Sequence, residues 1–100
     1  MNYDTAGVSE LLERLRDEGR FPPTPKIRRF EVEADHDHTG DPALFIWVLL
    51  DDGTPEEEFR WSALRPFEEA IREAVFASDD PRWPYVRFRT EAEHRELTRR

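Results

Sequence analysis

Hydrophobic and polar positions alternate through the middle of the chain in the manner of β-strands. In residues 27–34, Phe30 and Val32 point to one face while acidic side chains point to the other. Residues 43–50 are apolar on both faces, which is typical of a central strand that is covered on both sides. Residues 83–89 alternate again. The pattern therefore predicts three strands, with the second at the centre of the sheet.

Two further segments have the hydrophobic spacing of amphipathic helices. The first spans residues 9–16, with a serine as its N-cap and Gly19 as its end signal. The second spans residues 54–77 and begins with a threonine cap followed by proline. Pro66 lies inside this second segment, so we expect either a kink or two short helices in succession. Residues 20–25 form a stiff, Pro-rich connector.

The order of these elements predicts the fold class, a small α+β sandwich of the type α-β-β-α-β in which a long, Pro-kinked helix covers a three-stranded sheet. The first two strands form a hairpin, and the third lies either antiparallel beside the first or parallel beside the second. Either the N-terminal helix or a second copy of the chain covers the other face of the central strand. Residues 1–100 are expected to form a single domain with flexible ends at 1–7 and 92–100, and the polar last ten residues form either a frayed helix or a tail.

The composition of the chain excludes or disfavours several classes of function. The 23 acidic and 15 basic residues give a formal charge of −8, which argues against DNA or RNA as the main partner. The lack of cysteine excludes thiol nucleophiles, disulfide scaffolds and cysteine-rich zinc sites. The longest apolar run, residues 43–50, is too short to span a bilayer, and the N-terminus resembles no signal peptide. We therefore expect a cytoplasmic protein without membrane association.

The loop between the first two strands contains residue types that bind metal ions. Its first residues match the start of a calcium-binding EF-hand loop, although the closing bidentate glutamate is missing. The candidate ligands of a divalent metal are Asp35, His36, Asp37, His38 and Asp41. The alternative is a plain hairpin loop, in which Asp and Thr side chains satisfy backbone amides and Gly40 provides the turn. This second interpretation is favoured because hairpin loops are rich in these residue types.

Two groups of charged side chains are candidates for binding a partner. Arg87 and Arg89 on the third strand, together with the outward-facing Tyr85, have the chemistry to bind phosphate or a carboxylate-rich protein. Alternatively, they pair with Glu31 and Glu33 if the first and third strands are neighbours, and this alternative is favoured. The acidic stretch around Glu57 either docks on a basic protein or only complements the dipole of the helix that starts there.

No catalytic motif is recognisable in the chain. The sequence contains no Gly-x-Gly-x-x-Gly, no phosphate-binding loop and no Gly-x-Ser-x-Gly, so we expect neither an enzyme nor a cofactor apart from the candidate metal. The order of elements invites comparison with type II KH domains, which bind single-stranded nucleic acid. Residues 62–66 stand where those domains have a Gly-x-x-Gly loop, and the negative charge disfavours this function further.

Three segments together resemble a group of short, uncharacterised bacterial proteins. They are Asp37-His-Thr-Gly-Asp-Pro-Ala43, the Leu-Asp-Asp turn at 50–52 and Trp83-Pro-Tyr-Val-Arg-Phe-Arg-Thr-Glu91, and the similarity covers residues 27–93. Such proteins are associated with two-gene units whose other member is a toxin-like RNase or nucleotidyltransferase. The resemblance implies a companion, antitoxin-like role and identifies no catalytic residue. We therefore expect a non-enzymatic interaction module that is a homodimer, or the acidic partner of a second protein, or both.

Overall fold

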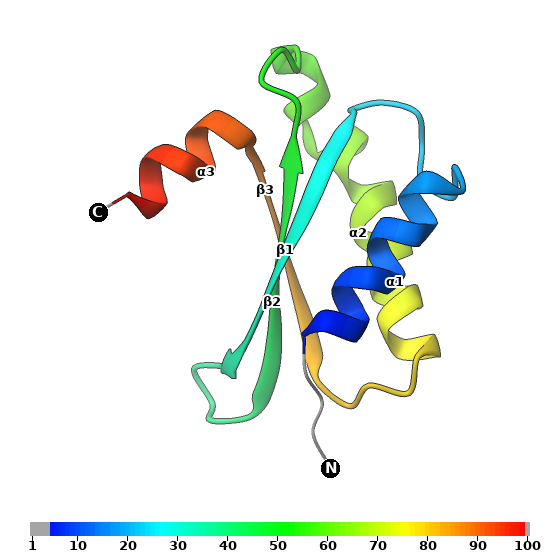
Figure 1. Cartoon of the computed structure of the whole chain (residues 1–100), viewed down its shortest axis with the longest axis vertical. Helices are drawn as coiled ribbons and strands as arrows, with labels where there is room; N and C mark the ends of the chain where they lie inside the picture. Colours follow the sequence, from blue (N-terminus) through cyan, green and yellow to red (C-terminus); the bar gives the residue numbers. More distant parts are fainter. Residues whose placement is uncertain (1–4, 100) are drawn as a thin grey trace.

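A computed structural model of the chain describes residues 5–99 (Figure 1). The elements follow one another as α1 (Ala6–Asp17), β1 (Ile27–His36), β2 (Pro42–Leu50), the 3-10 helix η1 (Glu56–Phe59), α2 (Trp61–Ala77), β3 (Trp83–Thr90) and α3 (Glu91–Thr98). The predicted α+β class and the predicted order α-β-β-α-β are confirmed, with η1 and α2 in the place of the single long helix. One further helix, α3, follows β3.

Within the described residues the strands form one sheet in the order β1-β2-β3. β1 and β2 are the predicted antiparallel hairpin, and β2 is the predicted central strand. Of the two positions open to the third strand, β3 occupies the one parallel to β2, with Ile46 opposite Val86. The chain therefore crosses over between β2 and β3, and η1 and α2 make that crossover.

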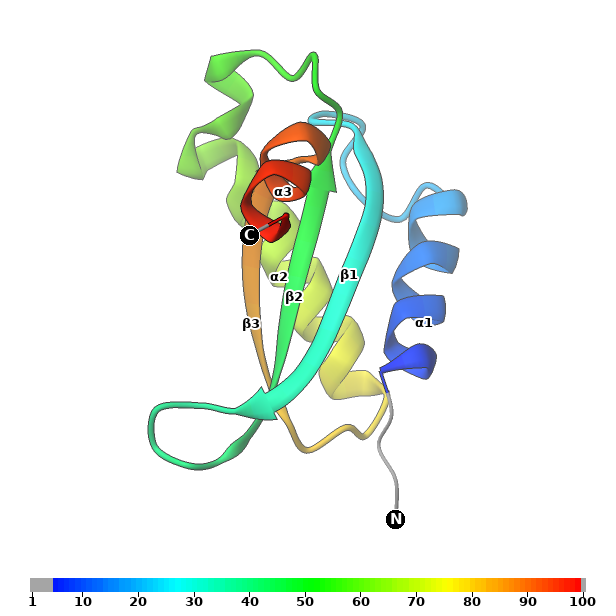
Figure 2. The same cartoon turned by 60° about the vertical axis from the view of Figure 1, so that its left-hand side comes forward.

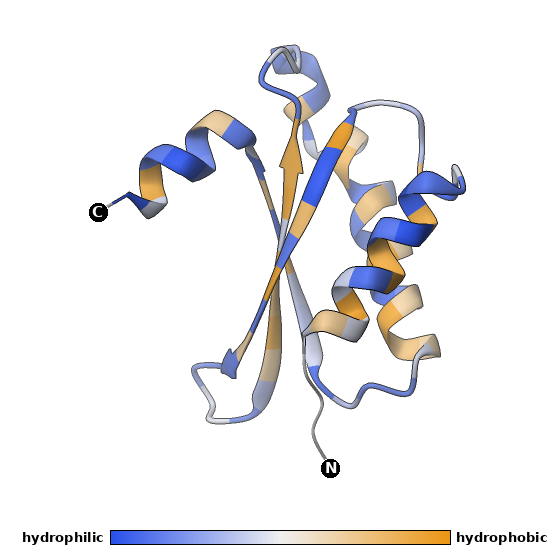
Figure 3. Cartoon of the chain, viewed as in Figure 1, coloured by the Kyte–Doolittle hydropathy of each residue, from blue (hydrophilic) through white to orange (hydrophobic). Residues whose placement is uncertain are grey.

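Helices α1 and α2 both lie on the same face of the sheet (Figures 1 and 2). Alternate side chains of β2 enter the core on this face, and Figure 3 shows the apolar residues along β2 and on the helices. The core comprises Val8, Leu12, Ile27, Phe30, Leu44, Ile46, Val48, Leu50, Leu64, Phe67, Ile71, Val75 and Val86. The proposed cover of the second face by the N-terminal helix is thus wrong, because α1 packs beside α2 on the first face.

The end of α1 follows the sequence signal, whereas its start does not. The helix begins at Ala6, so Ser9 lies inside it and is not its cap. At the other end Gly19 adopts φ of +70°, and the amides of Gly19 and Arg20 donate to the carbonyls of Arg16 and Leu15. This pattern is a Schellman motif, which glycine permits because it lacks a Cβ.

The segment predicted as a helix from residue 54 consists of two helices in succession. They separate at Arg60, whose backbone is extended, and Pro66 lies inside α2. Thr54 does not cap a helix, because its hydroxyl donates to the carbonyl of Asp51 in the preceding turn. The separation therefore falls six residues before the proline from which it was predicted.

The C-terminal part of the chain, predicted to be a flexible end, contains α3. Thr90 and Glu93 form a capping box: the amide of Glu93 donates to the Thr90 hydroxyl, and the amide of Thr90 donates to the Glu93 carboxylate. Of the predicted flexible N-terminal end, residues 1–4 lie outside the described residues. α3 lies on the face of the sheet opposite α1 and α2 (Figures 1 and 2).

Candidate functional site

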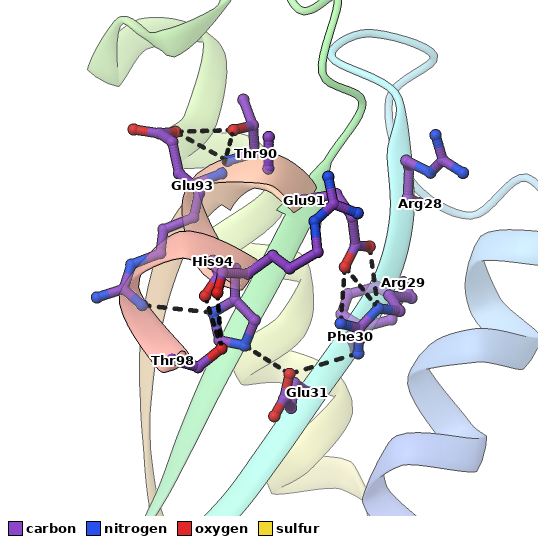
Figure 4. Close-up of polar contacts among 12 residues, drawn as sticks. Arg28, Arg29, Phe30, Glu31, Thr90, Glu91, Glu93, His94 and Thr98 are labelled. Carbon is purple, nitrogen blue, oxygen red and sulfur yellow. Dashed lines mark hydrogen bonds and ion pairs between the residues drawn. The ribbon is translucent and has the colours of Figure 1, made fainter. Parts of the chain in front are cut away.

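Helix α3 covers one end of the second face of the sheet and is held there by polar contacts (Figure 4). The guanidinium of Arg29 on β1 donates to both carboxylate oxygens of Glu91, at 2.7–3.1 Å. The amide of Ala92 donates to Oδ1 of Asp52 at 2.7 Å. The carboxylate of Glu91 is therefore ionised in its ion pair, and the pKa of Glu91 is lowered chiefly by its hydrogen bond with Arg29.

His94 is the buried centre of this contact, with only 4% of its surface exposed. Its Nε2 lies 2.5 Å from a carboxylate oxygen of Glu31, and its Nδ1 lies 3.3 Å from Nη1 of Arg89. Because a guanidinium only donates, Nδ1 of His94 accepts a hydrogen bond from Arg89. The ring proton is then on Nε2, which donates a hydrogen bond to the Glu31 carboxylate. The guanidinium of Arg89 also stacks over the Trp47 ring, 3.7 Å from its centroid. Sequence reasoning missed this cluster.

The predicted ion pairs of Glu31 and Glu33 with Arg87 and Arg89 are not formed. They required β1 and β3 to be neighbours, but β2 lies between these strands. Trp47 stands between Glu31 and Arg87 in the register of the sheet. Glu31 instead contacts His94, and Arg89 lies under α3.

The remaining end of the second face has no covering element among residues 5–99. Phe45 and Tyr85, side by side on β2 and β3, stack there with ring centroids 5.3 Å apart and 13° between the planes. Both rings are only partly buried, and they are flanked by the exposed side chains of Glu33 on β1 and Arg87 on β3. We call the surface formed by Glu33, Phe45, Tyr85 and Arg87 the open half-face.

The hairpin loop beside the open half-face is organised by Asp37. Its Oδ1 accepts from the amide and hydroxyl of Thr39, at 2.9 and 2.6 Å, and from the amide of Asp41 at 3.1 Å. Its Oδ2 accepts from the hydroxyl of Tyr85 at 3.0 Å, which ties the loop to β3. Gly40 adopts φ of +87° in the turn. These contacts agree with the hairpin-loop interpretation.

The hydrogen bonds to Asp37 favour its charged form. They lower its pKa from 3.8 to about 2, and the largest cause is the hydrogen bond from the Thr39 hydroxyl. On the other side of the same contact, the hydrogen bond to Asp37 raises the pKa of the Tyr85 phenol, and the charges of Asp37 and Asp41 add to this effect. The carboxylates of Asp37 and Asp41 therefore make the surroundings of the Tyr85 hydroxyl electrostatically negative.

Replacing Thr39 with valine is expected to raise the pKa of Asp37 more than replacing Tyr85 with phenylalanine. The reason is that the Thr39 hydroxyl is the largest cause of the lowered pKa. The sign follows from linkage: a depressed pKa stabilises the folded chain above pH 3.8, and this contribution is lost as the pH falls toward 2. Carboxyl-carbon NMR titrations of Thr39→Val and Tyr85→Phe measure both effects. A larger rise in Tyr85→Phe would contradict this ranking.

The candidate metal ligands lie in or beside this loop without forming a recognisable metal centre. Within residues 5–99, no group of three or more His, Asp or Glu side chains is placed to hold a metal ion. His36 and His38 are exposed, and the oxygens of Asp37 accept hydrogen bonds within the loop and from Tyr85. The metal site stays a prediction that this geometry does not favour.

The structure separates the three predicted partner-binding residues. Glu57 lies on η1, at the opposite end of the molecule from the hairpin loop (Figure 1). Arg89 is enclosed between Trp47 and α3, so of the three only Arg87 lies on the open half-face. Tyr85, predicted to face outward beside Arg87, also lies there, and the missed residue of this surface is Phe45, whose signal was an aromatic side chain on the strand expected to be central.

Comparison with known proteins finds no matching protein family, no matching curated protein and no matching solved structure. In the part of the chain that the structure describes, no helix is both long and apolar enough to cross a membrane.

Proposed function

We propose that this protein is a non-enzymatic interaction module, an acidic companion that binds a basic protein on its open half-face. The observation that carries this proposal is the stacked pair of Phe45 and Tyr85, partly exposed and bordered by carboxylates. Aromatic rings at the centre of a surface patch, with charged groups at its rim, are the usual composition of a protein-binding site.

The charges around this surface favour a basic partner over a second copy of the chain. Among residues 5–99, four carboxylates lie at this end of the sheet, and the exposed guanidinium beside them is that of Arg87. They are Glu33 and Asp35 on β1, and Asp37 and Asp41 in the hairpin loop. Two copies packed face to face at this end would bring these carboxylates together, which is unfavourable, whereas a basic surface would be attracted to them.

The formal charge of −8 supports the same conclusion, because it raises the rate at which a basic protein encounters this one. The companion role implied by the resemblance to short bacterial proteins of two-gene units is compatible with it. A toxin-like RNase has to attract RNA, so such a protein presents the basic surface that this proposal requires.

The proposal is tested by recovering the tagged, full-length protein from its own host and analysing it by native mass spectrometry. We expect a stoichiometric second protein of basic isoelectric point. The exposed pair Glu33→Lys/Asp35→Lys on β1 should reduce its recovery by about tenfold or more, because both substitutions reverse charge at the proposed contact. The matched control Glu56→Lys/Glu57→Lys makes the same change of charge on η1 and should leave recovery unchanged.

Three results would overturn the proposal. The first is a bare homodimer, which would leave self-association as the only interaction of this chain. The second is a partner whose recovery falls equally in both double variants, because net charge alone would then explain binding. The third is a partner lost only from Glu56→Lys/Glu57→Lys, which would place the contact on η1.

A further inference from the structure

A hollow of about 500 Å³ opens beside the open half-face, between the hairpin loop and the start of β3. Asp37, Asp41 and Pro42 line it from the hairpin, and Trp83 and Tyr85 line it from β3. Two of the segments singled out in the sequence, residues 37–43 and 83–91, thus meet at one place. The hydrogen bond from Tyr85 to Asp37 joins the two walls.

The aromatic wall of the hollow suits a planar cation. The Trp83 ring is 46% exposed, and its neighbours on α2 are Phe76, at 5.6 Å between ring centroids, and Arg72, whose guanidinium carbon lies 5.2 Å from the ring centroid. Neither Arg72 nor Phe76 is among the residues that line the hollow. The guanidinium of Arg72 thus lies against this indole, and aromatic faces attract such groups because of their quadrupole.

The carboxylate wall supplies negative charge that is not balanced within the hollow. Oδ2 of Asp41 lies 3.2 Å from the Thr39 hydroxyl, and Oδ1 of Asp41 accepts no hydrogen bond from the described residues. The lining also includes the guanidinium of Arg82, which is bonded through Nε and Nη2 to the two carboxylate oxygens of Asp80, so this pair adds no net charge. Asp37 and Asp41 therefore leave the hollow anionic.

We propose that this hollow binds the guanidinium group of an arginine side chain, stacked on Trp83 and hydrogen-bonded to Asp41. The geometry favours this ligand over a divalent metal, because the described residues supply no third carboxylate or imidazole to the site. It favours guanidinium over ammonium because a planar, weakly hydrated cation both stacks on an indole and donates in pairs to a carboxylate. The source of the arginine, a basic partner protein, rests on the proposed function; the site itself does not.

The test uses a small probe and the purified full-length protein at low ionic strength. The probe is N-acetyl-arginine methylamide, and its neutral control is N-acetyl-citrulline methylamide, which has nearly the same shape without the charge. We expect saturable NMR shifts of the Trp83 indole and of the Tyr85 amide, with a Kd in the millimolar range, as for one cation–π contact with one ion pair. The citrulline compound should bind at least about tenfold more weakly.

Two variants and their controls locate the site. Trp83→Ala should abolish the shifts at Tyr85, whereas Trp61→Ala, which removes another exposed indole, on α2, should leave them intact. Asp41→Asn, an exposed substitution in the loop, should weaken binding severalfold, whereas Glu57→Gln should not. Asp41→Asn keeps the test valid if Trp83→Ala alters folding.

The inference is overturned if the shifts do not saturate, if citrulline binds as well as arginine, or if Asp41→Asn and Glu57→Gln behave alike. Calcium or zinc alone producing the same shifts at micromolar concentration would also overturn it, in favour of a metal site. A failure of arginine binding does not affect the recovery experiment that tests the proposed function. If a basic partner is recovered but arginine does not bind, the companion role is supported and only the hollow is rejected as the contact.

Discussion

Replacing Asp80 with alanine is expected to destabilise the folded chain by about 3–5 kcal/mol, which is the usual cost of leaving one member of a buried ion pair without the other. Asp80 and Arg82 lie in the turn between α2 and β3, and their side chains are 6% and 7% exposed. The carboxylate accepts from Nε and Nη2 of the guanidinium at 2.9 and 2.7 Å, and from the backbone amide of Arg82 at 3.0 Å. Without Asp80 the buried guanidinium loses this carboxylate and the two hydrogen bonds that it accepts from Nε and Nη2.

Urea unfolding at neutral pH measures this loss, with Asp79→Asn as the matched control. Asp79 is the exposed neighbour of Asp80 and has φ of +62°, a conformation that asparagine also tolerates. The control should therefore change the free energy of unfolding by less than about 0.5 kcal/mol. Equal effects of the two substitutions would show that the ion pair contributes nothing beyond ordinary surface charge.

The same pair gives a prediction for the pH dependence of Asp80→Ala. Hydrogen bonding to Arg82 holds the pKa of Asp80 below its usual value of 3.8, in spite of burial. A depressed pKa stabilises the folded chain above pH 3.8, and that stabilisation is lost as the pH falls through the pKa of the folded state. The difference in stability between the natural chain and Asp80→Ala should therefore narrow in acid.

Replacing Phe67 with alanine is expected to lower the free energy of unfolding by about 3–5 kcal/mol, because a large side chain leaves a cavity in a closely packed core. Phe67 lies at the middle of α2, is 0% exposed and stacks on Phe21 at 6.0 Å between ring centroids. Phe21 comes from the Pro-rich connector, so the substitution weakens the contact between that connector and α2 as well.

Phe76→Ala on the same helix is the matched control for Phe67→Ala. It makes the same change of side chain and of helix propensity, but Phe76 is 48% exposed and touches Trp83 at the surface. Its loss should be no more than about 1.5 kcal/mol, the upper range for one aromatic pair. A similar shift of the urea midpoint in both variants would mean that the face of α2 packed against the sheet is not the one described here.

The central strand of the sheet was predictable from the sequence, because burial on both faces requires apolar residues at consecutive positions. The run of apolar residues 43–50 identified the central strand because such a strand has no face on which polar side chains reach water. The position of β3 was not predictable, because its alternation of Val86 and Phe88 with polar residues suits either neighbour. The leucine stripe of α1 likewise indicated burial without indicating which face of the sheet it covers.

α3 was predicted only as one of two alternatives, a frayed helix or a tail, because it has almost no apolar stripe. Its one buried side chain is His94, which packs through hydrogen bonds and ring contacts. The available signal was Thr90-x-x-Glu93, a capping box, which marks a helix start independently of hydrophobicity. Of the candidate site, Arg87, Tyr85 and Asp37 were identified from residue type. Their relation to Phe45 depends on the parallel pairing of β2 with β3, which no local pattern encodes.

The crossover between β2 and β3 also determines when, during folding, the surface between the hairpin loop and β3 forms. β1 and β2 are joined by a short loop, so their pairing needs little loop-closure entropy. β3 reaches its place only after the chain from Asp51 to Arg82 has passed over the sheet, and contacts of such sequence separation are slow to form. A chain synthesised only as far as the end of β2 therefore possesses the loop carboxylates but not the rings of Trp83 and Tyr85 on β3. The proposed recognition at this surface therefore requires the completed chain, because a hairpin peptide cut from it lacks the wall that β3 provides.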